Sequence, residues 1–264
     1  MKLPIYQLDA FSGRVFAGNP AAVCPLKDWL PDVTMQAIAA ENNLAETAFF
    51  VGANGKYAIR WFTPTVEVDL CGHATLAAGA VVMKRLEPKL DTVRFTTKSA
   101  GDLTVDRDGD MFVLDFPSWP PKPVVAPDGL EQALGARPAQ VLAARDYLCV
   151  MRDAHAVKAL SPNFAALKRL GKAVIATAPA AKGNGEDCDF VSRFFAPAVG
   201  IDEDPVTGSA HCILTPYWAQ ALGKAKLKAR QISPRGGELV VELKGDRVRI
   251  AGRVAPYLEG AIDV

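Results

Sequence analysis

The sequence predicts an α+β fold made of two similar halves, in which mixed or mostly antiparallel sheets accompany a small number of helices. Two observations predict this class. Short apolar runs bounded by Gly, Asp, Pro or Asn recur along the chain, whereas helical patterns are few. In addition, a pattern of strand, acidic loop and helix start occurs twice, about half a chain length apart.

The strand signals are short and numerous. Among them, an Asp108-Gly109 pair between two apolar runs predicts a β-hairpin, because this dipeptide strongly favours a tight turn. The strands are expected at residues 5–11, 21–26, 47–52, 57–63, 92–97, 101–107, 110–116, 147–152, 173–179, 189–197, 237–245 and 247–255.

Helical periodicity is confined to a few segments. In the last of them Pro216 predicts a kink or an early break, since proline lacks the amide hydrogen that an α-helix uses. The helices are expected near residues 34–43, 74–86, 129–134, 161–170 and 209–222.

The internal repeat relates two copies of one local pattern. Residues 60–64, Arg-Trp-Phe-Thr-Pro, match residues 193–197, Arg-Phe-Phe-Ala-Pro. Residues 70–74, Leu-Cys-Gly-His-Ala, match residues 206–210, Val-Thr-Gly-Ser-Ala. Each copy puts a glycine at the start of an apolar helix, where backbone N–H groups and the helix dipole favour a carboxylate or phosphate. We expect the two helix starts to face one cleft.

The proline-rich segment at residues 118–129 lies near the middle of the chain and predicts an extended linker. We therefore expect an N-terminal half at residues 1–118, which carries Glu46 and the Cys-Gly-His helix start. The C-terminal half at residues 119–264 carries the Thr-Gly-Ser helix start, and its last strand can return to the first half.

Composition and charge exclude several classes of function. The formal net charge of the 264 residues is only +1, so we expect no nucleic-acid partner. The five cysteines form no Cys-x-x-Cys pair and the three histidines are far apart, so we expect neither a disulfide framework nor a metal site. We see no secretory signal and no apolar run long enough for a membrane span, so the cytoplasm is the expected location and no membrane partner is expected.

Four longer motifs resemble the phenazine-biosynthesis PhzF-like isomerases, in the order expected and along nearly the whole chain. They are DAFSGRVFAGNPAAV at 9–23, ENNLAETAFF at 41–50, RWFTPTVEVDLCGHAT at 60–75 and FVSRFFAPAVGIDEDPVTGSAH at 190–211. The resemblance implies the diaminopimelate epimerase-like fold, in which each half wraps a sheet around a central helix. It also implies a homodimeric isomerase or epimerase that moves a proton within a small carboxylic acid in the cleft between the halves, without a cofactor.

The resemblance assigns roles to particular residues. Glu46 corresponds to the acid/base that carries the proton, and His73 and Asp204 complete the catalytic set. The residues expected to contact the substrate are Asn19, Gly72, Gly208, Ser209 and Arg235. His211 lies one position beyond the second glycine turn, and we expect it to be structural.

Two alternatives remain open. Diaminopimelate epimerase and proline racemase use two facing thiols, and Cys71 could be one base of that kind. The repeat puts Thr207 at the facing position, however, and a threonine hydroxyl cannot act as the second base near neutral pH. The other alternative is a metabolite-binding protein that has the same fold but no turnover.

Overall fold

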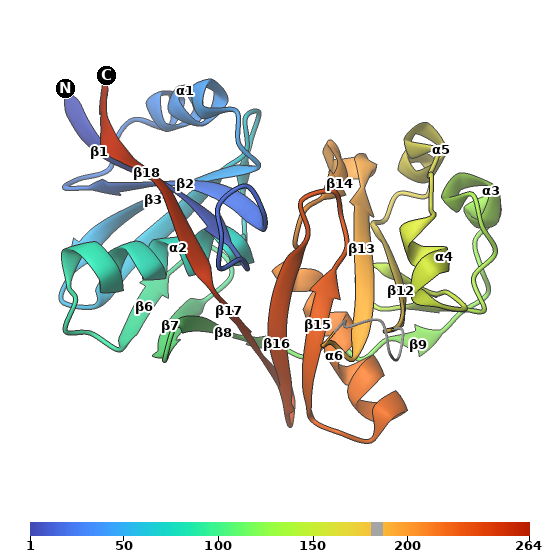
Figure 1. The fold of residues 1–264 in the computed structure, drawn as a ribbon. Coiled ribbons are helices and arrows are strands. Elements are labelled where there is room, and N and C mark those ends of the chain that lie inside the picture. Colours follow the sequence, from blue (N-terminus) through green and yellow to red (C-terminus); the bar gives the residue numbers. More distant parts are fainter. Residues whose placement is uncertain (181–186) are drawn as a thin grey trace. The chain divides into compact units, whose positions relative to one another are not determined.

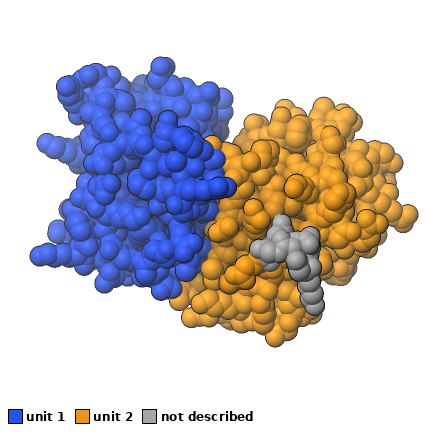
Figure 2. Space-filling model, in the orientation of Figure 1, with its two compact units in different colours: residues 1–115, 251–264 blue, residues 116–250 orange. Residues whose placement is uncertain are grey.

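The computed structural model describes residues 1–180 and 187–264. The chain divides into two compact units, which Figure 2 colours separately. Unit 1 comprises residues 1–115 and 251–264, and unit 2 comprises residues 116–250. The C-terminal segment therefore belongs to the same unit as the N-terminus, and the Val264 N–H donates to the Met1 carbonyl oxygen at 2.9 Å.

Unit 1 is a sheet with one helix on each face (Figure 1). Helix α1 (Asp32–Asn42) covers one face, and helix α2 (Gly72–Val81), continued by a π-helical turn (Val82–Leu86), lies against β1, β2 and β3. The strands are β1 (Lys2–Ala10), β2 (Asn19–Leu26), β3 (Glu46–Ala53), β4 (Lys56–Phe62), β5 (Glu67–Val68), β6 (Thr92–Thr96), β7 (Asp102–Asp108), β8 (Met111–Pro117, which ends in unit 2) and β18 (Val254–Asp263).

Unit 2 repeats this plan, with α6 on one face of its sheet and several short helices on the other. The helices are α3 (Leu130–Leu134), α4 (Ala154–Lys158), α5 (Phe164–Arg169), a single 3₁₀ turn (Pro197–Val199) and the long α6 (Gly208–Leu222). The strands are β9 (Lys122–Pro123), β10 (Gln140–Ala143), β11 (Tyr147–Val150), β12 (Val174–Pro179), β13 (Phe190–Ala196), β14 (Ile201–Asp204), β15 (Lys226–Gln231), β16 (Gly237–Lys244) and β17 (Arg247–Gly252, which ends in unit 1).

The two units share one scheme of strand pairing. In unit 1, β1–β2 is antiparallel, β2–β3 parallel and β3–β4 antiparallel, and β4 also pairs with β5 antiparallel and with β6 parallel. In unit 2, β10–β11, β11–β12 and β12–β13 follow the same order, and β13 pairs with β14 antiparallel and with β15 parallel. The prediction of two similar halves is confirmed, and the repeat is a duplication of the whole sheet.

Each copy also gives its final strand to the other unit. Strand β9 follows the eighth strand of the first copy, yet it pairs with β10 of unit 2. Strand β18 follows β17 at the end of the second copy, yet it pairs antiparallel with β1 of unit 1. The segment expected as a linker therefore contributes a strand to unit 2.

The repeat extends to one arginine–glutamate pair. In unit 1, Arg60 Nε and Nη2 donate to the two carboxylate oxygens of Glu67 at 2.6 and 2.7 Å. In unit 2, Arg193 Nε and Nη2 donate to those of Glu203 at 2.7 and 2.8 Å. Each pair ties the fourth strand of its copy to the short strand that precedes the central helix. Parallel N–H···O bonds of this kind fix orientation as well as distance.

Helix α2 is buried on all sides because strands of unit 1 pack around it. Nine of the ten residues of α2 are buried, and most of them are small. Small side chains let the sheet approach closely, and a Cβ added at Gly79 would lie 2.8 Å from the Cβ of Val105 on β7. None of the helices in the described part of the chain is long and apolar enough to span a membrane.

Helix α6 continues through Pro216 to Leu222, so the expected early break is wrong. Proline at this position leaves the carbonyl of Cys212, four residues earlier, without its helical donor. The backbone N–H of Trp119 supplies that hydrogen bond at 2.9 Å. A segment far away in sequence thus satisfies the carbonyl, and the helix is not interrupted.

Candidate functional site

A buried polar cluster lies at the start of α2 in unit 1. Asn19 begins β2, Glu46 begins β3, and His73 lies in the first turn of α2. Their relative exposures are 0%, 8% and 5%, respectively. Glutamate and histidine are seldom buried so deeply unless neighbouring groups satisfy them.

The backbone before β2 brings Asn19 into this cluster. Gly18 has a φ of 72°, and a Cβ at that position would lie 2.3 Å from the carbonyl oxygen of Ala10. Glycine is therefore required at this point of the turn. The parallel ladder of β2 and β3 then begins at Ala21 and Glu46, which sets the carboxyl group one strand away from Asn19.

Sheet alternation directs Glu46 toward α2. Ala22 and Cys24 of β2 pack with Met35 of α1 on one face of the sheet. Their neighbour Ala21 faces the other side, because successive side chains of a strand point to opposite faces. Glu46, paired with Ala21, shares that side and meets His73 of α2.

The imidazole of His73 contacts Asn19 and Cys71 through Nδ1 and the Glu46 carboxylate through Nε2. The Asn19 side-chain amide donates to Nδ1 at 3.1 Å, and the Cys71 Sγ lies 3.5 Å from the same nitrogen. Nε2 lies 3.2 Å from Oε2 of Glu46. Because Nδ1 accepts from Asn19, a neutral ring carries its hydrogen on Nε2, which faces the carboxylate. The Nε2–Oε2 pair has the distance of a polar contact but not the alignment of a hydrogen bond.

His73 is neutral at physiological pH. Complete burial lowers its pKa to about 3, since removal from water penalises the charged imidazolium. The contact with Glu46 is therefore one between a neutral donor and a carboxyl group, not an ion pair.

The Glu46, Cys71 and His73 side chains each offer one ligand atom, and these atoms lie within 4.8 Å of one another. A metal ion bonds to an imidazole along the lone pair of a single nitrogen. Here the thiol lies at Nδ1 and the carboxylate at Nε2, on different sides of the ring. This arrangement does not fit one ion held by all three groups.

A second polar cluster lies at the start of α6 in unit 2, around the turn from Asp204 to Thr207. The Thr207 hydroxyl donates to the Asp204 carboxylate. Gln231, the last residue of β15, makes hydrogen bonds to both ends of this turn. Its Oε1 accepts from the Thr207 N–H at 2.9 Å, and its Nε2 donates to the Asp204 carbonyl at 2.8 Å. Gln231 is completely buried, and sequence reasoning missed it because an isolated glutamine in a strand has no motif.

Two further contacts fix the same turn. The ring of His211 bonds through Nδ1 to the Thr207 carbonyl at 2.8 Å, and burial lowers the pKa of His211 to about 4, so the neutral ring donates from Nδ1. The Ser233 hydroxyl donates to the Pro205 carbonyl at 2.8 Å. This contact brings the loop that carries Arg235 against the turn.

Neither central helix is capped by its own N-cap side chain. Cys71 precedes α2 and Thr207 precedes α6, both in extended conformation and without a side-chain cap hydrogen bond. Gly72 and Gly208 occupy the first helical positions. Helix starts of this kind offer backbone N–H groups and a positive dipole end to an anion.

The expected site residues thus fall into two groups, each within its own unit. Unit 1 brings together Asn19, Glu46, Gly72 and His73. The group in unit 2, which lies around the start of α6, comprises Asp204, Gly208, Ser209 and the loop of Arg235. Sequence reasoning also missed Arg145, whose Nη2 donates to the Ser209 hydroxyl at 3.5 Å.

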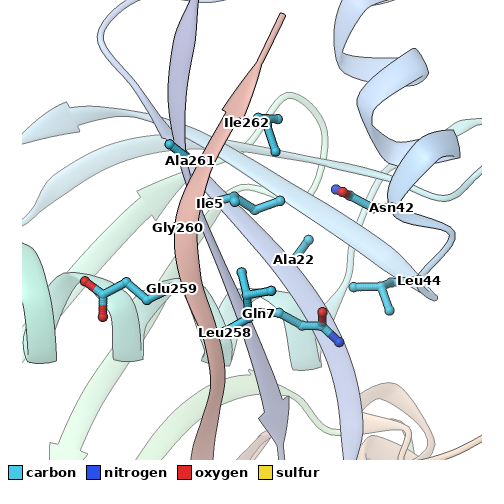
Figure 3. A pocket seen from close by; sticks show the side chains of 10 residues that line it. All are labelled: Ile5, Gln7, Ala22, Asn42, Leu44, Leu258, Glu259, Gly260, Ala261 and Ile262. Atoms are coloured by element: carbon cyan, nitrogen blue, oxygen red, sulfur yellow. The ribbon is translucent and has the colours of Figure 1, made fainter.

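A separate hollow of about 340 Å³ lies on unit 1 between α1, β1, β2 and β18 (Figure 3). Ile5, Ala22, Leu44 and Leu258 line it with other side chains. It belongs to the face of the sheet that α1 covers, whereas Glu46 and His73 lie on the face of α2. The hollow is therefore not part of the polar cluster.

Comparison with known proteins agrees with this fold. A Pseudomonas aeruginosa protein named as an uncharacterized isomerase is 52% identical over 263 residues, which cover 99% of each chain. The crystal structure of a PhzF-family phenazine biosynthesis protein from Enterococcus faecalis superposes over 100% of both chains, with a TM-score of 0.95 and 44% identity. A probable proline racemase from Agrobacterium radiobacter has the same fold at 13% identity, with a TM-score of 0.61 over 99% of this chain and 93% of its own.

The model of the phenazine biosynthesis-like protein family matches residues 8–260, which is nearly all of the sequence. This match spans both copies of the duplicated sheet, the Glu46–His73 cluster and the Asp204–Thr207 turn. The chain belongs to the phenazine biosynthesis-like (PhzC-PhzF) family.

Proposed function

We propose that this chain is an isomerase that moves a proton between two carbon atoms of a small carboxylic acid, with Glu46 as the acid/base. The relatives named as isomerases support the reaction class. The observation that carries the proposal is the buried Glu46 carboxyl beside the neutral Nε2–H of His73. A general base must lie within hydrogen-bond reach of the proton it takes, and exclusion of water strengthens the electrostatic interactions around it.

The reaction needs neither an oxidant nor a reductant. Glu46 takes a proton from a substrate C–H bond, and the electron pair stays on the substrate, delocalised toward its carboxylate or a neighbouring double bond. An O–H bond then exists on Glu46, which returns the proton to a second carbon. His73 donates to Glu46 or to the substrate in this cycle, and such contacts commonly tighten only once the substrate is bound.

The turn at Asp204 and the first residues of α6 are suited to hold the substrate. Backbone N–H groups at a helix start favour a carboxylate. We assign substrate contacts to Asp204, Gly208 and Ser209 on this basis. The hydrogen bonds from Gln231 and His211 make the turn rigid, which keeps its donors in place without reorganisation.

Replacing Glu46 by Gln tests the proton carrier directly, because the amide keeps the shape but cannot accept a proton from carbon. Small cyclic and unsaturated carboxylic acids are incubated with the protein in deuterated buffer, and deuterium uptake is followed by NMR. We expect the variant to exchange about 100-fold to 10,000-fold more slowly than the wild type. Glu41→Gln on the exposed side of α1 is the matched control. Wild-type exchange in Glu46→Gln contradicts the assignment.

The same assay separates the alternatives. Cys71 lies against His73, so a base role for this thiol is the competing mechanism. If Cys71→Ser abolishes exchange while Glu46→Gln does not, the thiol is the base. If an acid binds and no exchange occurs in any form of the protein, the chain is a binding protein and the isomerase proposal is wrong.

A further inference from the structure

The loop between β10 and β11 lies against the first turn of α6. Arg145 in this loop donates from Nη2 to the Ser209 hydroxyl at 3.5 Å, and its guanidinium lies 5.3 Å from the centre of the Trp119 ring. Trp119 is itself fixed to α6 through its N–H bond to the Cys212 carbonyl. The aromatic ring thus orients a cation that is half exposed and lies at the helix start.

The next residue, Asp146, is a carboxylic acid that the mechanism above does not use. It is only 4% exposed, and its Oδ2 forms an ion pair with Arg145 Nε at 3.4 Å that lacks the alignment of a strong hydrogen bond. Burial raises the pKa of Asp146, and the nearby cations Arg145 and Lys172 offset that rise in part. A buried carboxylate oxygen without an aligned donor is costly, and such groups concentrate at functional sites.

The internal duplication identifies the position in unit 1 that corresponds to Asp146. The matched strand pairings of the two units put Asp146 where unit 1 has Ala21, and Ala173 where unit 1 has Glu46. In unit 1 these two positions lie side by side and face α2. The register therefore directs one buried carboxyl group in each unit to the face of its central helix, from the start of β3 in unit 1 and from the residue before β11 in unit 2.

A purely structural ion pair explains these features less well. Pairs that stabilise a fold are usually well aligned, as Arg193 and Glu203 are in this unit, with two hydrogen bonds between them. Arg145 and Asp146 lack that alignment, and half of the arginine side chain is exposed to solvent. The guanidinium is accessible to a ligand at the same point where the helix offers its N–H groups.

We propose that Arg145, Asp146 and Ser209 form a recognition subsite for a small carboxylic acid that carries a hydroxyl or amino group on a neighbouring carbon. Arg145, the Ser209 hydroxyl and the first N–H groups of α6 bind the carboxylate. Asp146 accepts a hydrogen bond from the neighbouring hydroxyl or amino group. This proposal rests on the proposed function for the view that the bound acid is a substrate.

The test is a binding titration of the full chain with three probes of one size: lactate, propionate and propionamide. The amide signal of Ser209 is followed by NMR. We expect saturable shifts with propionate, tighter binding of lactate, and no saturable shift with propionamide. Arg145→Gln weakens the binding of both acids by about tenfold to a hundredfold, since a charge-assisted hydrogen bond is lost. Arg145→Lys keeps part of the binding because it keeps the charge.

Asp146→Asn separates the two roles. We expect the preference for lactate over propionate to fall to about one, because the amide is a weaker acceptor than the carboxylate. Arg152→Gln is the control, since this arginine is 83% exposed and pairs with Asp153 away from Ser209. The proposal is wrong if propionamide shifts Ser209 as propionate does, if Arg152→Gln weakens binding as much as Arg145→Gln, or if the lactate preference survives in Asp146→Asn.

The binding titrations test the subsite, whereas the isotope-exchange assay tests the proton carrier. If Glu46→Gln exchanges normally while the titrations behave as expected, the proton carrier is wrong and the subsite is retained. If Glu46→Gln loses exchange while Arg145→Gln binds like the wild type, the proton carrier is retained and the subsite is wrong.

Discussion

At the scale of single residues, the chemistry of unit 1 depends on which nitrogen of His73 carries its hydrogen. Asn19 donates to Nδ1 at 3.1 Å, which leaves the hydrogen on Nε2 toward Glu46. We therefore regard Asn19 as a positioning residue that acts through His73, in addition to any contact it makes with substrate. The consequence is a specific expectation for its replacement.

Asn19→Leu keeps the side-chain volume and removes the amide donor. We expect the Nδ1–H form of His73 to become populated and deuterium exchange to slow by about tenfold, the value of one lost hydrogen bond. Nitrogen NMR of the His73 ring measures the first effect and the exchange assay the second. Asn42→Leu, which removes a 3.1 Å bond to Thr47 in the same unit, should leave the His73 ring signals unchanged. An unaltered ring spectrum in Asn19→Leu would contradict this role.

Motifs pointed to Glu46, His73 and Asp204, but not to the residues that hold them. Gln231 makes hydrogen bonds to both ends of the Asp204–Thr207 turn, and Asp146 is buried beside Arg145. In the sequence, a single polar residue in a strand or a short loop looks the same whether it is buried or exposed to solvent. Its burial follows from the packing of distant segments, which local sequence patterns do not report.

At the scale of elements, the two Arg–Glu pairs form a natural comparison because the duplication makes them equivalent. Arg60 binds Glu67, which is 29% exposed, and Asp32, which is 71% exposed. Arg193 binds Glu203, which is 13% exposed, and donates to the carbonyl of Leu160 at 2.8 Å. The pair in unit 2 is thus further from water and holds a helix end as well.

Arg193→Ala should therefore destabilise the protein more than Arg60→Ala. Removing one member of a buried pair leaves the other charge uncompensated, which costs about 3–5 kcal/mol. The carboxylate partners of Arg60 reach solvent, so for Arg60→Ala we expect the free energy of unfolding to fall by about 1–2 kcal/mol, mostly because hydrogen bonds are lost. Urea unfolding measures both free energies. Equal losses would show that solvent access to the partner carboxylates does not set the cost.

Local patterns predicted most of the regular structure. Every expected strand segment contains a strand, and the Asp108-Gly109 hairpin joins β7 to β8 through a loop in which Gly109 has a φ of 61°. The strands that were missed, β5, β9, β10, β14 and β15, are short or mostly polar. Most of the ten-residue β18 also lies beyond the expected segment, which ends at residue 255. The continuation of α6 through Pro216 could not be predicted, because it depends on Trp119, a residue distant in sequence.

At the scale of the whole molecule, the duplication accounts for both the fold and its asymmetry. Each copy supplies a sheet, a central apolar helix and an uncapped helix start, but the chemical groups differ between the copies. His73 in the first turn of α2 has Ser209 as its counterpart in α6, and the N-cap Cys71 has Thr207. In the proposed function, the first copy supplies the groups for proton transfer and the second those that bind an anion.

Both units also bury a neutral histidine, and this makes the stability of the whole protein depend on pH. Burial lowers the pKa of His73 to about 3 and that of His211 to about 4. In the unfolded chain both return toward an ordinary value of about 6.5. Between these limits the unfolded state binds protons that the folded state does not, so the free energy of unfolding falls as the pH falls below about 6.5.

We expect the free energy of unfolding to be nearly constant from about pH 7 to 8 and to decrease below about pH 6.5, by up to about 1.4 kcal/mol per pH unit for each histidine. Asp146 opposes part of this loss, because its raised pKa favours proton uptake by the folded state. Urea unfolding at a series of pH values above about 5 measures the slope before most carboxylates titrate. His211→Asn keeps a donor for the Thr207 carbonyl and removes one of the two titrating rings, so the slope should fall by about half. A slope that is unchanged in this variant would mean that His211 is protonated alike in both states, and its neutral contact with the α6 start would have to be abandoned.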